Sequence, residues 1–186
     1  QSYFVQSANP SPFVHLWYVS LYVQLLIVGY LLRKLMKKLN FLRMQEFALL
    51  AFLTLASAAG MAALYWFEQD PSHVYYLVST RLFSFTFGAL LSYIHEGKLL
   101  LPERETGSVV PNALSILCLG ALGWMFTTFN GTQAEVYYMM MFISSFVMML
   151  LLSCTIREGV GVHYLFSFKG FTFFGKRSFS YYLWFY

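Results

Sequence analysis

Five long apolar runs constrain the structure of this 186-residue chain more than any other feature. Each run has about 20 residues, the length that an α-helix needs to cross the hydrocarbon core of a bilayer. Because backbone polar groups find no water inside a bilayer, only helices or closed barrels can span it. The runs are continuous and show no period-two alternation, so they predict helices. They are Phe13–Leu32, Phe47–Phe67, Val74–Ile94, Asn112–Phe129 and Val136–Ile156, followed by a partial run, Phe171–Tyr186.

The composition supports the same conclusion. Hydrophobic residues make up 59% of the chain and charged residues 11%, whereas a soluble domain carries about 25% charged residues. A soluble globular domain, a disordered chain and a nucleic-acid-binding protein all need more charge than this. We therefore expect an all-α, polytopic transmembrane helix bundle with five full spans and one partial span. Its partner is the lipid bilayer of a cell membrane, and no nucleic acid is expected.

Basic residues are concentrated in alternate loops. Lys and Arg occur between the first and second runs, between the third and fourth, and after the fifth, while the other two loops contain acidic residues but no Lys or Arg. Cytoplasmic loops of membrane proteins carry an excess of Lys and Arg. This pattern predicts that the segment before the first run lies outside and that the Arg33–Arg43 loop is cytoplasmic.

Arg81 is the one charged residue within the five full runs. A charge in a span costs at least a few kcal/mol and usually marks a functional site. Arg81 lies seven residues into its run, or about 10 Å from the outer end. A second interpretation is that the side chain extends outward to the lipid headgroups.

The first run has polar residues on two opposite helical faces. His15, Tyr18 and Tyr22 share one face, and Trp17, Ser20 and Gln24 share the other. A lipid-facing helix would not be polar on two sides, so we expect this helix inside the bundle with Tyr22 and Gln24 largely buried. An interfacial belt of aromatic residues explains Trp17 and Tyr18 equally well. His15, at the outer mouth, suits either a packing or a catalytic role.

The two cysteines, Cys118 and Cys154, show neither metal-ligand spacing nor a CxxC motif. We interpret them as small packing residues, and we expect no metal site.

Three motifs, in order along almost the whole chain, resemble those of the membrane acyltransferase family 3. The first is the run from His15 to Gln24, which reads HLWYVSLYVQ. The second is Ser79-Thr80-Arg81-Leu82 followed by Gly88-Ala89-Leu90-Leu91, and the third is GKRSFSYYLWFY, from Gly175 to Tyr186. Within that family, the chain resembles the peptidoglycan O-acetyltransferases of Gram-positive bacteria.

The resemblance implies an integral membrane O-acyltransferase. Such an enzyme moves acetyl from a cytoplasmic acyl-CoA donor, acetyl-CoA, across the bilayer to a cell-surface glycan, here a muramic acid hydroxyl of peptidoglycan. Acetyl-CoA is a substrate, and no bound cofactor is expected. The family's domain is about twice as long, so residues 1–186 are expected to be part of one transmembrane acyltransferase domain. Spans with a catalytic His would precede them, and an extracytoplasmic SGNH-type domain on the same full-length chain could follow.

The resemblance also implies roles for individual residues. Outer-side tyrosines would carry the acyl group, because a phenol oxygen can accept an acyl group when a base or a cation activates it. The expected catalytic residues are Tyr3, Tyr75, His15 and Arg81. The expected substrate-binding residues are Trp17, Tyr22, Gln24 and Ser84. Tyr22 and Ser84 stand where family members often have Glu, and Phe185 stands where they have His, so a mechanism that uses those groups does not transfer.

Tyr75 and Arg81 are six residues apart, about 120° from each other around an ideal helix. Direct contact is therefore not expected without a bend, although the two are expected to line the outer half of one cavity, with His15 and Tyr3 close by. A membrane transporter and an inactive scaffold or binding subunit are the alternative functions. Transporters tend to have helices broken by paired Gly or Pro residues, and none of the five runs has such a pair.

Overall fold

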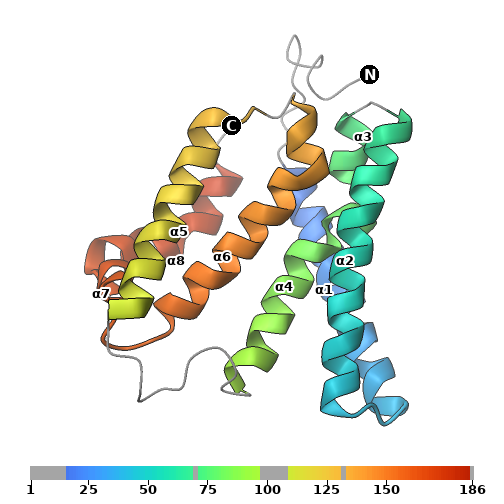
Figure 1. Cartoon of the computed structure of the whole chain (residues 1–186), viewed down its shortest axis with the longest axis horizontal. Coiled ribbons are helices and arrows are strands. Elements are labelled where there is room, and N and C mark those ends of the chain that lie inside the picture. Colours follow the sequence, from blue (N-terminus) through green and yellow to red (C-terminus); the bar gives the residue numbers. More distant parts are fainter. Residues whose placement is uncertain (1–15, 69–70, 97–108, 131–132, 185–186) are drawn as a thin grey trace.

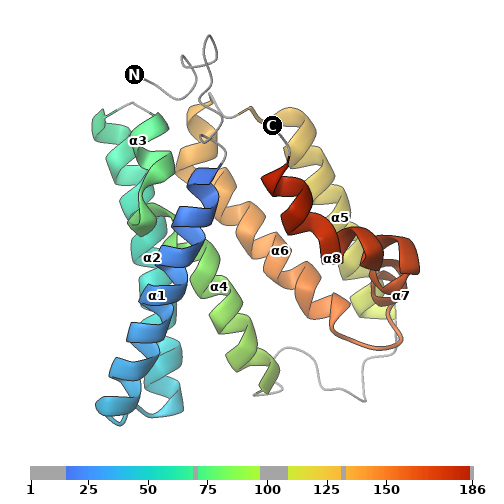
Figure 2. The ribbon, with the colours of Figure 1, turned by 180° about the vertical axis from the view of Figure 1, so that it is seen from behind.

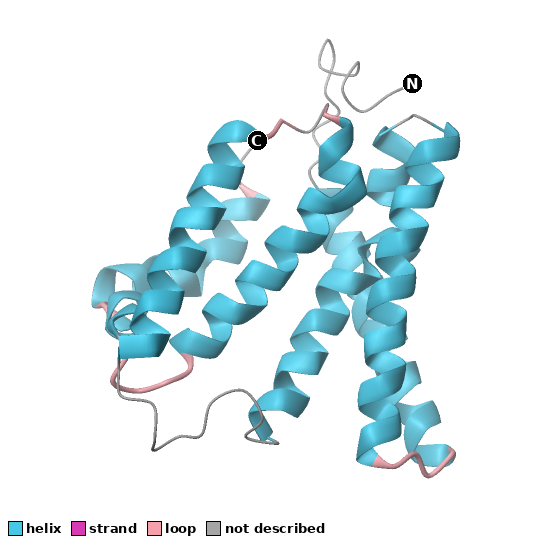
Figure 3. Ribbon diagram, viewed as in Figure 1, coloured by secondary structure: helices cyan, strands magenta, loops and turns pink. Residues whose placement is uncertain are grey.

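The computed structural model describes residues 16–68, 71–96, 109–130 and 133–184. Within these ranges the chain consists of helices and loops (Figure 3). Five helical stretches are long and apolar enough to cross a membrane, so the predicted all-α bundle with five spans is confirmed. The elements are α1 (Trp17–Lys38), α2 (Arg43–Glu68), α3 (Pro71–Tyr76), α4 (Val78–Glu96), α5 (Val109–Thr128), the π-helical segment η3 (Val136–Met140), α6 (Met141–Thr155), α7 (Gly161–Ser167) and α8 (Lys169–Leu183).

The helices α2, α4, α6 and α5 follow one another across the molecule in Figure 1. Seen from behind, α1 and α8 lie in front of this row and approach each other at their upper ends (Figure 2). The partial sixth run corresponds to α8, whose described side chains are mostly exposed.

A tight connection joins α1 to α2. Asn40 has a positive φ of 53°, and the Phe41 N–H donates to the carbonyl oxygen of Met36 at 3.1 Å. This six-to-one bond is typical of a Schellman helix end, where Asn tolerates the left-handed conformation. The Gln45 side chain then accepts a hydrogen bond from the Leu42 N–H at 2.9 Å, which satisfies an amide at the start of α2.

Two buried clusters stabilise the bundle. The larger combines residues of α2, α3, α4, η3 and α6, with Met61, Phe83 and Tyr137 at its centre. The smaller lies between α5, α6 and α7 and includes Cys118 and Cys154. Both cysteines are buried and unoxidised, as expected for packing residues. Since α6 contributes to both clusters, it joins the two halves of the bundle.

The span predicted over Val74–Ile94 is present as one membrane-length stretch, Val74–His95, but it is interrupted once. The run is divided at Leu77 into the end of α3 and the start of α4. Likewise, the fifth run begins with the π-helical turn η3 before it continues as α6. Both irregularities keep the length and apolar character of a span, which is why the run analysis did not detect them.

Tyr22 and Gln24, which the sequence predicts to be largely buried in the complete domain, are exposed on the described bundle, and their burial in the complete domain stays a prediction. Tyr22 is 50% exposed, and Gln24 is exposed with its amide donating to the Ser20 hydroxyl at 3.1 Å. The buried residues of α1 are Leu21, Leu25 and Met36, which lie on one side of the helix. The helix therefore lies at the edge of the described bundle, and its polar residues face outward.

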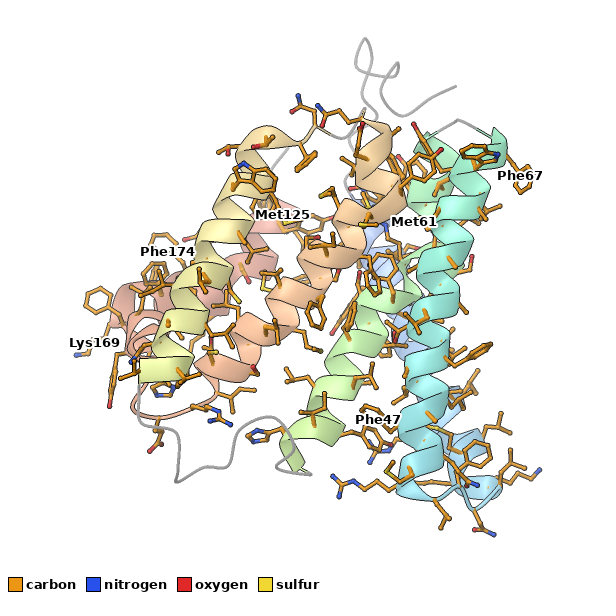
Figure 4. The ribbon with its side chains drawn as sticks, in the orientation of Figure 1. Phe47, Met61, Phe67, Met125, Lys169 and Phe174 are labelled. Atoms are coloured by element: carbon orange, nitrogen blue, oxygen red, sulfur yellow. The ribbon has the colours of Figure 1, made fainter. Side chains whose placement is uncertain are left out.

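The two ends of the bundle follow the predicted alternation of loops. Figure 4 shows Phe47 and Phe67 at opposite ends of α2. The last turn of α1, which contains Lys37, adjoins the Phe47 end, and Glu68 ends α2 at the other. We call the Phe67 end, where α3 and η3 also lie, the tyrosine end, and the Phe47 end the basic end.

Candidate active site

Side chains of the first turn of α4 bind backbone carbonyl oxygens around the break at Leu77. The Thr80 hydroxyl lies 2.6 Å from the carbonyl oxygen of Val74 and 2.8 Å from that of Leu77. The Nε–H of Arg81 donates to the carbonyl oxygen of Tyr75 at 3.3 Å. Broken helices occur inside membranes where side chains satisfy the freed backbone groups in this way.

The same break brings Arg81 onto Tyr75, a contact that was not expected without a bend in the helix. The Cζ atom of Arg81 lies 4.1 Å from the centre of the Tyr75 ring. A cation held over an aromatic face in a desolvated site gains about 2 kcal/mol. The ring and the carbonyl of one residue thus hold the guanidinium from two directions.

One nitrogen of Arg81 stays available. Its Nη2 is buried and has no hydrogen-bond partner among the residues that the structure describes. A buried donor without an acceptor is costly, and a substrate oxygen would satisfy it. Because Nη2 is buried, this part of the side chain does not reach the surface of the described bundle.

Aromatic side chains from several helices surround this pair. The Trp17 ring lies 4.8 Å from that of Tyr75 and 5.3 Å from that of Tyr76. Tyr18 contacts Tyr182 of α8, with ring centres 6.1 Å apart, so α1 and α8 meet at the tyrosine end. We call Arg81, Tyr75, Trp17 and Tyr137 the Arg81 cluster.

Tyr137 reaches the cluster from the π-helical turn. It is fully buried, stacks on Tyr65 with ring centres 4.9 Å apart, and lies near enough to interact electrostatically with Arg81. A π-helical turn shifts the angular position of the residues that follow it, and such turns are frequent at functional sites. The sequence analysis missed Tyr137, although the pair Tyr137-Tyr138 at the start of an apolar run was a possible signal.

The remaining predicted site residues lie elsewhere. Ser84 is exposed on α4, with its hydroxyl 3.2 Å from that of Ser145 on α6. Tyr22 and Gln24 lie farther along α1, on its exposed surface. Tyr3 and His15 are outside the described residues. The structure therefore brings together Tyr75, Arg81 and Trp17, and it does not place Tyr22, Gln24 or Ser84 in contact with them.

A mostly apolar cavity of about 750 Å³ lies along α7 and α8. Its lining residues include Lys176, Ser178 and Tyr181 from the third sequence motif, together with several phenylalanines. None of the predicted site residues lines this cavity, and it shares no lining residue with the Arg81 cluster.

The model of the acyltransferase domain family matches residues 2–186, almost the whole chain. The chain belongs to this acyltransferase family. The resemblance drawn from the three motifs is thereby confirmed.

Curated relatives of this acyltransferase chain agree with the family match. It is 28% identical over 189 residues to the putative peptidoglycan O-acetyltransferase YrhL of Bacillus subtilis strain 168. It is 29% identical over 194 residues to the peptidoglycan O-acetyltransferase OatA of Listeria monocytogenes serovar 1/2a. All of this chain is covered in both cases, but it spans only 30% of the length of either relative. No solved structure matches the chain.

Proposed function

We propose that this chain forms part of an integral membrane O-acetyltransferase that modifies a cell-surface glycan. Family membership and the activity named for both relatives support the reaction class. The observation in the chain itself that carries the proposal is the buried guanidinium of Arg81 against Tyr75, with one nitrogen that has no partner among the described residues. The proposed donor is cytoplasmic acetyl-CoA, and the proposed acceptor is a muramic acid hydroxyl of peptidoglycan.

The chemistry that we propose uses Tyr75 as the acyl carrier. Its phenol oxygen attacks an acetyl carbonyl that reaches the outer half of the bilayer on a carrier, which relays the acetyl group from cytoplasmic acetyl-CoA. The new C–O bond forms as the bond between that carbonyl and the carrier's oxygen or sulfur breaks, and the phenol proton passes to the departing carrier atom. A glycan hydroxyl then attacks the tyrosyl ester, and its proton returns to the phenol oxygen as the glycan ester forms. In both steps the tetrahedral intermediate carries a negative oxygen, which the free Nη2–H of Arg81 would stabilise.

The proposed orientation places the tyrosine end outside and the basic end in the cytoplasm. The lysines and arginines of the α1–α2 connection support this orientation, since positive loops stay inside. The basic end also contains a hydrogen-bonded group at the start of α2: the Tyr93 hydroxyl donates to Glu46 at 2.5 Å, and Arg43 donates to the Tyr93 carbonyl oxygen at 3.3 Å. In this orientation Tyr75 faces the glycan side.

A transporter is the second candidate, and one observation favours it. The sequence analysis counted the lack of paired Gly or Pro breaks against transport, but a span is nevertheless interrupted at Leu77. A broken helix beside an intramembrane charge is typical of substrate sites in transporters. Membership of the acyltransferase family supports the enzyme more directly.

The test uses the full-length protein that contains this chain, expressed in a bacterial host whose peptidoglycan carries no O-acetyl groups. Purified peptidoglycan is treated with mild alkali, and the released acetate is measured per muramic acid. We expect ester-linked acetate in expressing cells and none in the host. Uptake of a glycan precursor without any acetate ester would support the transporter, and neither activity would support a scaffold.

A further inference from the structure

A buried serine of α2 reaches into the hydrogen-bond pattern of α4, beside Arg81. Ser57 is 7% exposed, and its hydroxyl donates to the carbonyl oxygen of Ser79 at 2.5 Å. The hydroxyl oxygen of Ser57 also accepts a hydrogen bond from the Phe83 N–H at 3.1 Å. Residues 79 and 83 are the carbonyl and amide partners of one α-helical hydrogen bond. A side chain inserted at such a position is a recognised cause of a bend.

The turn of α4 that Ser57 binds contains Thr80 and Arg81, whose side chains form hydrogen bonds across the break at Leu77. Thr80 and Arg81 lie between residues 79 and 83, and they bind the carbonyl oxygens at the end of α3. A shift of this turn would therefore change the distance between the Arg81 guanidinium and the Tyr75 ring. Helices α2 and α4 lie side by side (Figure 1), and Ser57 of α2 lies in their contact surface.

We propose that Ser57 is a positioning residue, which fixes the guanidinium of Arg81 over Tyr75 by holding the first turns of α4. The inference rests on the proposed function, and it adds a residue that acts through the backbone. The described hydrogen bonds of Ser57 are made with the backbone of α4 and not with the side chain of Arg81 or Tyr75.

The chain offers a matched control on the same face of α2. Thr54 lies three residues before Ser57, is 2% exposed, and also donates its hydroxyl within the α2–α4 contact. Its partners are the Thr86 hydroxyl at 2.7 Å and the carbonyl oxygen of Leu50 at 2.7 Å. Thr54 therefore links the same two helices without binding the backbone of the Arg81 turn.

The experiment compares Ser57→Ala and Thr54→Val in the full-length protein. Each substitution removes one buried hydroxyl. Inside-out membrane vesicles receive radiolabelled acetyl-CoA, and alkali-labile label on the enclosed glycan gives kcat and the KM for acetyl-CoA. The thermal midpoint of each purified variant is measured in detergent. We expect Ser57→Ala to lower kcat at least tenfold with KM within twofold of the original, while Thr54→Val keeps kcat within twofold at a similar thermal midpoint.

A merely structural role would give a different pattern. Equal losses of kcat in the two variants, or a kcat for Ser57→Ala within twofold of the original, would overturn the positioning role. If Ser57→Ala does not accumulate, Ser57→Cys replaces it with the same expectation, because a thiol of similar size forms weaker hydrogen bonds. Absence of transfer by the unmodified protein would overturn the proposed function and the positioning role together, whereas normal transfer by both Ser57 variants overturns the positioning role alone.

Discussion

Arg81 uses three parts of its side chain in three different directions. The Nε–H binds a backbone carbonyl, the planar carbon lies over the Tyr75 ring, and Nη2 has no acceptor among the described residues. A lysine has one compact ammonium group and cannot occupy these positions together. The geometry of the guanidinium, in addition to its charge, therefore decides what this position can do.

Arg81→Lys tests the importance of this geometry. It keeps the positive charge but loses the separate donors, so we expect acetate on peptidoglycan to fall at least tenfold, consistent with the loss of one donor to an oxyanion. The protein level, measured by immunoblot of membranes, should change less than twofold. Activity close to that of the original protein would mean that any cation suffices and would remove the role given to Nη2.

At the residue scale the sequence predicted part of the site. Arg81 stands out because a single charge in apolar runs is costly, and Tyr75 is one of the outer-side tyrosines that the family resemblance implies. Ser57, Thr80 and Tyr137 were missed, since serine, threonine and tyrosine occur in spans for many reasons. Their importance depends on which backbone groups lie beside them, and composition carries no information about that.

At the scale of helices, hydropathy predicted which membrane-spanning helices exist and how long they are, but not where their hydrogen-bond pattern is interrupted. The five apolar runs predicted five spans correctly, because an apolar stretch of about 20 residues is typical of a transmembrane helix. The break at Leu77 and the π-helical turn η3 lie at the tyrosine end, and both bring tyrosines to Arg81. A change in hydrogen-bond pattern alters the direction of side chains without changing the hydropathy of a window.

Gly29 of α1 lies against the Phe85 ring of α4. A Cβ atom at Gly29 would lie 2.6 Å from Cζ of Phe85, whereas one at Gly88 of α4 would meet no atom within 4 Å. Gly29→Ala and Gly88→Ala gain the same helix propensity. The difference between their free energies of unfolding therefore reports the packing of the added methyl group. We expect Gly29→Ala to be less stable than Gly88→Ala by about 1–3 kcal/mol.

The free energy of unfolding, measured by denaturant titration in mixed micelles, checks this prediction. Equal stabilities would show that the Phe85 ring moves aside without cost, and that α1 does not require close contact with α4.

At the scale of the whole molecule, the exposed face of α1 is the main difference from expectation. Polar residues on two faces of a helix were taken to require burial, but the described bundle covers the face with Leu21 and Leu25 and leaves Tyr22 exposed. The chain spans 30% of the length of its relatives. Burial of Tyr22 and Gln24 in a complete domain therefore stays a prediction.

The orientation of the bundle is testable with two exposed residues at opposite ends of α2. Met44 is 77% exposed near the basic end, and Phe67 is 82% exposed at the tyrosine end. Each is replaced by Cys in a Cys118→Ala/Cys154→Ala background of the full-length protein, with any other cysteines also removed. Intact cells are treated with a maleimide that does not cross membranes. We expect labelling of Phe67→Cys in intact cells, and of Met44→Cys only after permeabilisation. The reverse pattern would contradict the proposed orientation.

The central claim is that the acetyl group passes through the phenol oxygen of Tyr75 beside Arg81. Tyr75→Phe removes that oxygen and keeps the ring under the guanidinium, and Tyr138→Phe is a control at the same end of the bundle, where Tyr138 packs against Tyr65. The measurement is alkali-labile acetate on peptidoglycan from cells with equal amounts of each full-length variant. We predict that Tyr75→Phe abolishes acetylation while donor binding stays intact, and that Tyr138→Phe keeps at least half of it. Acetylation by Tyr75→Phe at the original level would contradict the account and leave Tyr3 as the candidate carrier.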